Sequence, residues 1–349
     1  MGPSGSSRCG ARPGSRPRPA VTAWRVPAIL ACLLAFGCSR TPPPSGDRPA
    51  ARPAVTGSAG AAAPSDTPAS ASALPPGAAS CTAAGGPTCY RFATAEDAFR
   101  WVLAKDPLVL AVGEAHAQRG TEHIASSTKR FTDAFLPLLA PRATDVVVEL
   151  WAPDPKCMKE VKAVASAQKP VTDVQADTNQ NEYVTLGTTA KAAGMTPWLL
   201  RPTCDDFAML ADAGADAVGA MLGLVKRLTQ AKVAALHAKN KADGGAAPKA
   251  VIAYGGALHN DLSPPEATRE YSFGPELDQL TGGRYVELDL IVPEFVKKTP
   301  VWEKLPWYAS FEAEQASGQP RDKATLYVVG ERSFVLVFAS SAPAAPPSK

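Results

Sequence analysis

Short apolar runs alternate with amphipathic segments along the middle of the chain. Largely apolar segments with two or three valines each occur at 108–113 and 145–150, and shorter apolar segments lie at 197–200 and 250–254. Such runs are typical of interior strands in a parallel sheet that is covered on both faces. The segments between them have helical character, at about 120–140, 156–168, 182–193 and 205–241. In the first of these, Ile124, Phe131, Phe135 and Leu138 fall on one helical face.

The flanking segments complete the predicted fold. A short helix is expected at 94–103, with Thr94 and Asp97 as its N-terminal cap pattern. A partly alternating strand is expected at 284–292, and a terminal hairpin at 326–329 and 334–338. The sequence therefore predicts one α/β domain over residues 81–340, with a mainly parallel central sheet flanked by helices. Antiparallel strands are expected to be added in its C-terminal third.

The first 80 residues have a different character. Residues 1–25 carry five arginines and no acid, and an apolar run follows at 26–37 that is too short for a stable membrane span. This is the pattern of an export signal over residues 1–37. It ends in Leu34-Ala35-Phe36-Gly37-Cys38, which resembles a bacterial lipobox and predicts lipidation of Cys38. Ordinary cleavage, which would release a soluble secreted protein, is the alternative.

The segment 38–80 is rich in Pro, Ala, Ser and Gly and is expected to be a disordered tether, as is the tail at 341–349. We therefore expect an exported bacterial lipoprotein anchored in a membrane, facing the periplasm or the cell surface. Loss of the signal removes five of 36 basic residues and none of the 33 acidic ones, leaving 31 against 33 and a net charge near −2. Nothing in this balance indicates a nucleic-acid partner.

The cysteines fit an oxidising compartment. Of the seven, Cys9 and Cys32 leave with the signal and Cys38 is the expected lipid site, which leaves an even number for disulfides. Three pairings are possible. We favour Cys81–Cys89, which closes a small loop, and Cys157–Cys204, because each of these two follows a strand end on the same rim of the sheet.

Candidate catalytic groups gather where the predicted strands end. Gly113-Glu114-Ala115-His116 and Gly256-Ala257-Leu258-His259 each place a histidine three residues after a glycine that follows an apolar strand. The glycines are expected to let the backbone turn at the sheet edge. If the chain stays extended, Glu114 and His116 point to the same side.

Three further residues are placed near the same edge. Glu149 ends the second strand, Arg201 ends the third and could clamp a carboxylate or an oxyanion, and His123 is expected in the first turn of the 120–140 helix. A metal site would draw on His116, His259, Glu149 and His123, since divalent metals favour such nitrogen and oxygen ligands. Without a metal, the same groups suit acid–base catalysis. Each also has a structural interpretation, such as an ion pair between Glu149 and Arg201. The aromatic cluster of Trp302, Trp307, Tyr308 and Phe311 is interpreted as packing, and Tyr254 as core.

The paired Gly-x-x-His elements with Glu149 between them resemble a superfamily. It groups ChaN-type haem-binding lipoproteins, erythromycin esterases and the Tiki/TraB proteins, and the resemblance spans roughly residues 108–261. It implies an α/β sandwich with Glu114, His116, Glu149 and His259 as the catalytic residues at the sheet edge, and Arg201 as a substrate-binding residue. For the cofactor it implies either none, a divalent metal or haem, depending on the member.

Two functions remain open from the sequence. One is a hydrolase of a small-molecule or peptide substrate, in which His116 activates water, Glu114 or Glu149 orients it, and His259 is a second ligand or an acid. The other is a haem- or iron-binding lipoprotein without turnover.

Overall fold

The computed structural model describes residues 74–82, 85–243, 249–318 and 321–341. The predicted signal, the lipidation site Cys38, most of the predicted tether and most of the tail lie outside these residues. They stay predictions.

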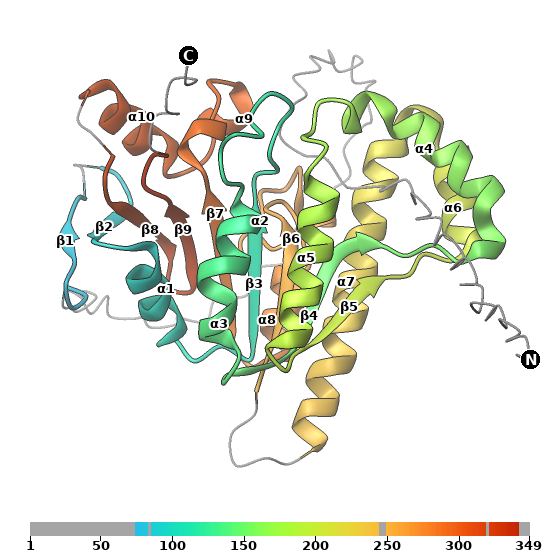
Figure 1. Ribbon diagram of the computed structural model, residues 1–349, viewed down its shortest axis with the longest axis horizontal. Coiled ribbons are helices and arrows are strands. Elements are labelled where there is room, and N and C mark those ends of the chain that lie inside the picture. Colours follow the sequence, from blue (N-terminus) through green and yellow to red (C-terminus); the bar gives the residue numbers. More distant parts are fainter. Residues whose placement is uncertain (1–73, 83–84, 244–248, 319–320, 342–349) are drawn as a thin grey trace, which may run out of the picture.

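A single sheet of nine strands runs through the described residues, in the order β1-β2-β8-β9-β7-β3-β6-β4-β5 (Figure 1). Neighbours from β9 to β5 are parallel, whereas β8 runs antiparallel to β9, β2 to β8 and β1 to β2. The strands are β1 Ala79–Ser80, β2 Thr88–Phe92, β3 Val109–Glu114, β4 Ala143–Trp151, β5 Thr196–Leu200, β6 Ala250–Gly256, β7 Tyr285–Ile291, β8 Ala324–Gly330 and β9 Ser333–Val337. The α/β class with a mainly parallel sheet is confirmed.

Helices cover both faces of this sheet. Alternate strand residues divide between the faces: Leu110 and Val112 pack with α1, α3 and α5, whereas Val109 and Ala111 pack with α4, α6, α7 and α8. The first set of helices lies in front of the sheet in Figure 1 and α7 lies behind it. The longer helices are α1 Ala95–Leu103, α4 Met158–Thr172, α5 Asn179–Ala192, α6 Cys204–Asp212, α7 Ala217–Ala242, α8 Gly274–Leu280 and α10 Tyr308–Ala316; the short ones are α2 Ser127–Arg130, α3 Leu136–Leu139 and α9 Pro300–Glu303.

Two helix predictions were wrong in their bounds. The helix expected from 120 begins only at Ser127, because the Ser126 hydroxyl accepts a hydrogen bond from Lys129 N at 2.9 Å and caps it there. The loop before this helix is held instead by backbone pairing of Gln118 with Gln175. The long helix expected at 205–241 is two helices, α6 and α7, bent by 113° at Gly214, whose φ of 53° lies in the left-handed region.

The strand predictions need two corrections. Residues at the end of the predicted tether form β1, which is ordered by backbone pairing with β2 rather than by apolar burial. The antiparallel strand expected in the C-terminal third is confirmed by β8, which runs antiparallel to β9, while β7 and β9 extend the parallel sheet. The remaining antiparallel strands, β1 and β2, come from the start of the domain and were not predicted.

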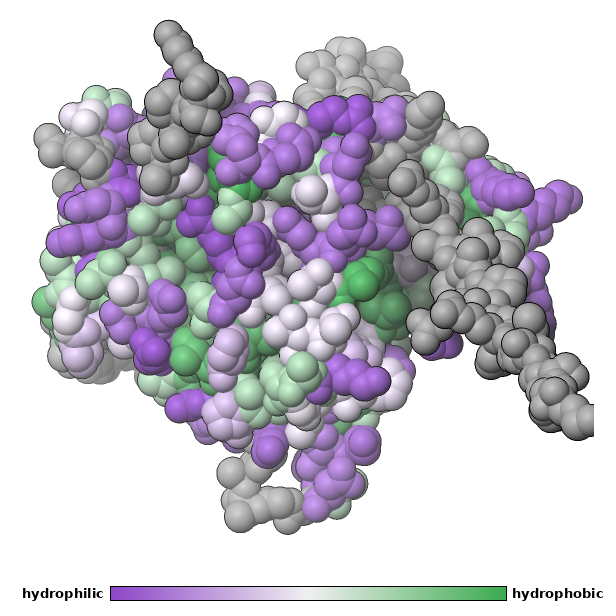
Figure 2. Space-filling model, in the orientation of Figure 1, coloured by the Kyte–Doolittle hydropathy of each residue, from purple (hydrophilic) through white to green (hydrophobic). Residues whose placement is uncertain are grey.

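Two disulfides confirm the favoured pairings, Cys81–Cys89 and Cys157–Cys204, each with Cα atoms 4.9 Å apart. The predicted aromatic cluster also packs as expected, between β8, β9 and the helices α9 and α10. No single described helix is long and apolar enough to cross a membrane, although the bent α6–α7 pair passes that test by length and composition alone. On the face shown in Figure 2, hydrophobic residues form separate areas among hydrophilic ones.

Candidate functional site

Glu114 ends β3 on the face covered by α2 and α5, and it is 3% exposed. Its carboxylate has four hydrogen-bond partners. Oε1 is 2.8 Å from His116 Nδ1 and accepts from the Tyr183 hydroxyl at 2.7 Å. Oε2 accepts from Thr128 at 2.6 Å and from Tyr254 at 2.8 Å. The extended geometry expected for Glu114 and His116 is therefore present, and it holds the imidazole by its Nδ1 atom.

The charge on Glu114 is set by two opposing effects. Burial by itself raises the pKa of this carboxyl, but its hydrogen bonds to His116, Thr128 and Tyr183 outweigh burial, and the net shift lowers the pKa. Burial, together with the charge of Glu114, raises the pKa of Tyr183 and of Tyr254 well above the usual 10. Glu114 is thus an anion at neutral pH, and both tyrosines stay neutral donors to it.

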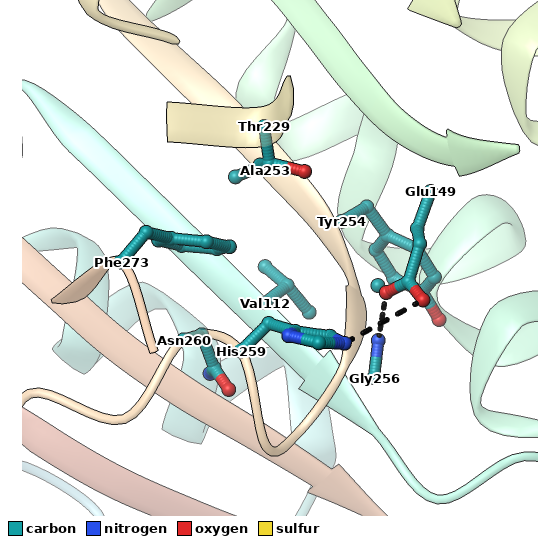
Figure 3. Close-up of a pocket in the computed structure, with 10 residues that line it drawn as sticks. Val112, Glu149, Thr229, Ala253, Tyr254, Gly256, His259, Asn260 and Phe273 are labelled. Atoms are coloured by element: carbon teal, nitrogen blue, oxygen red, sulfur yellow. Dashed lines mark hydrogen bonds and ion pairs between the residues drawn. The ribbon is translucent and has the colours of Figure 1, made fainter. Parts of the chain in front are cut away.

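Glu149 lies near the end of β4 on the other face of the sheet and is also 3% exposed. Its Oε2 atom accepts one hydrogen bond, from the backbone N–H of Gly256 at 2.8 Å. Its Oε1 atom is 3.9 Å from His259 Nε2, which is too far for a direct hydrogen bond. Neither Oε1 nor Nε2 has a hydrogen-bond partner among the described residues. Figure 3 shows the carboxylate and the ring turned toward each other beside Gly256.

The backbone fixes the tautomer of His259. Its Nδ1 atom is 2.9 Å from the carbonyl oxygen of Tyr271, an atom that can only accept, so Nδ1 carries the proton. In the neutral ring, Nε2 is then an acceptor, and it faces the carboxylate acceptor of Glu149. A void of about 10 Å³ adjoins the two groups, which is near the smallest volume that holds one water molecule.

The two halves of the site meet at β6. A Cβ on Gly255 would lie 2.2 Å from Glu149 Oε2, and a Cβ on Gly256 would lie 3.5 Å from His116 Nε2 and 3.8 Å from Glu149 Oε2. His116 and Glu149 therefore both lie beside Gly256, and only Glu149 also lies against Gly255. Gly255 allows this close approach by having no side chain, and Gly113 does the same for Asp289 and Asn260. The turn expected at Gly113 is not there, since β3 continues through it to Glu114, whereas β6 ends at Gly256 as expected and the His259 N–H donates to the Gly256 carbonyl at 3.1 Å.

The other predicted site residues are not brought to this centre. His123 is exposed in the loop before α2, and Arg201 is exposed at the end of the edge strand β5. Arg201 does not line the void between Glu149 and His259. Within the described ranges, no group of three or more His, Cys, Asp or Glu side chains is arranged to hold a metal ion. The four-residue donor set expected for a metal is thus not assembled in this conformation.

Three residues of the site were missed or misinterpreted from the sequence. Thr128 and Tyr183 were not predicted to contact Glu114, and Tyr254 was interpreted as core. Tyr254 is buried as expected, but its hydroxyl donates to Glu114. Tyr183 lies in the segment correctly predicted as helical, and a search for polar atoms on the buried face of that helix would have found it.

Comparison with protein-family profiles and with curated proteins gave no match. Among solved structures, the chain is similar to the type III effector HopBA1, at 12% identity and a TM-score of 0.36. The match covers 71% of this chain and 94% of the effector. A likeness this weak supports no argument about function.

Proposed function

We propose that this protein is a hydrolase whose attacking water binds between Glu149 and His259. The observation that carries the proposal is the pair of buried, unpartnered acceptors, Glu149 Oε1 and His259 Nε2, 3.9 Å apart beside a void of about 10 Å³. Two buried acceptors that face each other are costly unless a donor lies between them. One water satisfies both, because it donates one hydrogen to each.

This placement gives the residues distinct roles. Glu149 accepts a proton from the water as the oxygen attacks a carbonyl carbon, and His259 orients the water through its second hydrogen. His116, whose Nδ1 atom is held 2.8 Å from the Glu114 carboxylate, donates the proton on its Nε2 atom to the leaving group. The sequence had placed water activation on His116 itself. The geometry favours Glu149 for that step because the unpartnered atoms face each other at Glu149.

The substrate class is an ester or an amide, including peptides. All four acid–base residues are buried or nearly so, with side-chain exposures of 8% for His116 and 2% for Glu114 and of 2% and 3% for His259 and Glu149. A substrate therefore reaches them only when part of the covering structure moves, such as the loop at 117–125 between β3 and α2, which follows His116 directly.

Hydrolysis of an ester and peptide panel tests this proposal. Glu149→Gln should lower the rate by roughly 10² to 10⁴-fold, the usual contribution of a positioned general base. Asp145→Asn is the matched control, because Asp145 is a buried carboxylate on the same strand that accepts hydrogen bonds from Trp198 and Thr144. No turnover by the unaltered protein, or equal rates for Glu149→Gln and the control, would end the proposal.

Chelator treatment separates the metal-assisted version of the same chemistry. Loss of hydrolysis with a chelator and its return with a divalent cation would show that hydrolysis requires a metal ion, bound by Glu149 and His259. Unchanged rates would favour water alone. Haem does not fit the void beside His259, which has room for about one water. A Soret band on haem titration would therefore have to arise elsewhere, for instance at the exposed His123.

We also propose that the protein is exported and anchored through lipid on Cys38. The leader pattern supports this, and two disulfides are consistent with an oxidising compartment. Cys38→Ala should move the protein from the membrane fraction to the soluble fraction. The same distribution for both forms would contradict the anchor.

A further inference from the structure

His259 sits on an irregular segment, residues 257–273, between β6 and α8. Its bond from Nδ1 to the carbonyl of Tyr271 lies within this same segment and cannot fix the ring relative to the sheet. Backbone hydrogen bonds tie the start of the segment to the sheet, from Ala257 N to Glu114 O at 3.2 Å and from His259 N to Gly256 O at 3.1 Å. A further contact holds the residues that follow His259.

That contact is a row of polar side chains on β7. Tyr285, Glu287 and Asp289 alternate along the strand and so point to the same face of the sheet. The Tyr285 hydroxyl donates to the carbonyl oxygen of Asn260 at 2.5 Å. Glu287 accepts from the N–H of Leu262 at 2.8 Å, and Asp289 accepts from the Asn260 side-chain amide at 2.9 Å.

The row reaches across β3 to do this. In the register, Asp289 of β7 is opposite Gly113 of β3. A Cβ on Gly113 would lie 2.4 Å from Asp289 Oδ1, 2.7 Å from Asn260 Oδ1 and 2.6 Å from Ala257 Cα. The missing side chain at Gly113 thus lets the segment lie directly against the strand that carries Glu114.

We propose that Tyr285, Glu287 and Asp289 are positioning residues that hold His259 at its working distance from Glu149. Asn260 and Leu262, which they bind, follow His259 directly or within three residues in the chain. The inference rests on the proposed function only for the consequence of moving His259; the docking itself is independent of any reaction.

This docking contact is acidic and therefore depends on pH. Burial, followed by the charge of Asp261, raises the pKa of Asp289 to about 7, against the lowering effect of its Asn260 bond. Burial and the charges of Asp289 and Asp261 raise the pKa of Glu287 well above 4.5. The neighbouring elements bring little positive charge to this row. Ser333 of β9 and Gly113 of β3 are uncharged, and Asp278 of α8 forms an ion pair with Arg332.

The sign of the effect follows from the raised pKa. Protonated Asp289 contributes stability that is fully present below its unfolded pKa, near 3.8, and that contribution is lost as the pH rises through about 7. Above that pH, the carboxylates repel each other and the docking of residues 257–273 weakens.

Nuclear magnetic resonance of ¹⁵N-histidine-labelled protein tests the proposal without requiring hydrolysis. The His259 ring signals, assigned with His259→Gln, should coincide in the unaltered protein and in Asp289→Asn at pH 6, because the variant keeps an acceptor for Asn260. Above pH 7, where Asp289 is charged only in the unaltered protein, the signals of the two proteins should differ. Asp289→Ala removes the acceptor too and should shift or broaden those signals at every pH.

Asp145→Asn is the control for loss of a buried carboxylate elsewhere and should leave the His259 signals unchanged. Identical signals above pH 7 in Asp289→Asn and in the unaltered protein would overturn the proposal, as would unchanged signals in a folded Asp289→Ala. If Asp289→Ala does not fold, Asp289→Asn alone decides. Failure of the ester and peptide panel would end the proposed hydrolase and leave this result standing, so the two failures are distinguishable.

Discussion

Glu114 and Glu149 are each 3% exposed and lie near the ends of β3 and β4, yet the hydrogen bonding of the two carboxylates differs sharply. Glu114 has four hydrogen-bond partners, three of them neutral hydroxyls. Glu149 has one backbone donor, and its second oxygen faces another acceptor. The first carboxylate is satisfied by the fold, whereas the second requires something that the described residues do not supply.

This difference distinguishes a carboxylate that stabilises the fold from one that is available for catalysis. A satisfied buried carboxylate locks its neighbours into one arrangement, here the imidazole of His116 and two tyrosines. An unsatisfied one costs folding free energy and persists where it serves a function. We therefore expect substitutions at Glu114, which also supports the proposed acid His116, to lower both stability and turnover, and substitutions at Glu149 to lower turnover without lowering stability.

The largest stability effect is expected for Glu114→Ala. It leaves the hydroxyls of Thr128, Tyr183 and Tyr254 buried without their acceptor, which should lower the free energy of unfolding by about 3–5 kcal/mol. Urea unfolding followed by circular dichroism measures this. A loss below about 1 kcal/mol would show that these hydrogen bonds do not hold the fold together.

A smaller effect is expected when one donor is removed. Tyr183→Phe and Tyr254→Phe each delete one hydrogen bond to the charged Glu114, so each should cost about 2 kcal/mol of unfolding free energy. The Tyr183 hydroxyl is also 3.5 Å from His116 Nδ1, whereas Tyr254 bonds to the far oxygen. Only Tyr183→Phe should also reduce hydrolysis of the ester and peptide panel, and equal rates for the pair would remove this distinction.

Glu149→Gln should change stability in the opposite direction. It removes a buried charge that has one donor and can place an amide N–H toward His259 Nε2, so we expect a gain of about 1 kcal/mol in unfolding free energy. The same variant should be the least active in hydrolysis. Destabilisation as large as that of Glu114→Ala would contradict the contrast between the two carboxylates.

The smallest expected effect is on the stability of the protein at acid pH. Because the folded pKa of Glu114 is lowered, its contribution to stability is present above the unfolded pKa of about 4.5 and is lost as the pH falls through the folded value. Glu114→Gln should therefore flatten the acid limb of a plot of unfolding free energy against pH. The exposed Glu331→Gln is the control, and an identical acid limb in all three proteins would argue against this role of Glu114.

Much of the fold could be predicted because its determinants are local. The apolar runs at β3, β4 and β6 are buried strands as expected, and both disulfide pairings follow from position along the chain. The site was partly predictable for the same reason: Glu114 and His116 are two residues apart on extended backbone and must share a side. Arg201 and His123 do not reach this site. Arg201 follows an edge strand and His123 lies in the loop before α2, and both positions leave the side chain in solvent.

The sequence by itself determined which segments become strands and that two histidines and two glutamates lie at or near strand ends, because periodicity and chain direction are local properties. Only the tertiary structure decided which carboxylate is satisfied. Tyr183 arrives at Glu114 from 69 residues away and Tyr254 from 140, and no local pattern encodes the direction of a hydroxyl across that distance. The opposed acceptors of Glu149 and His259 likewise exist only because β4, β6 and the segment docked on β7 pack together.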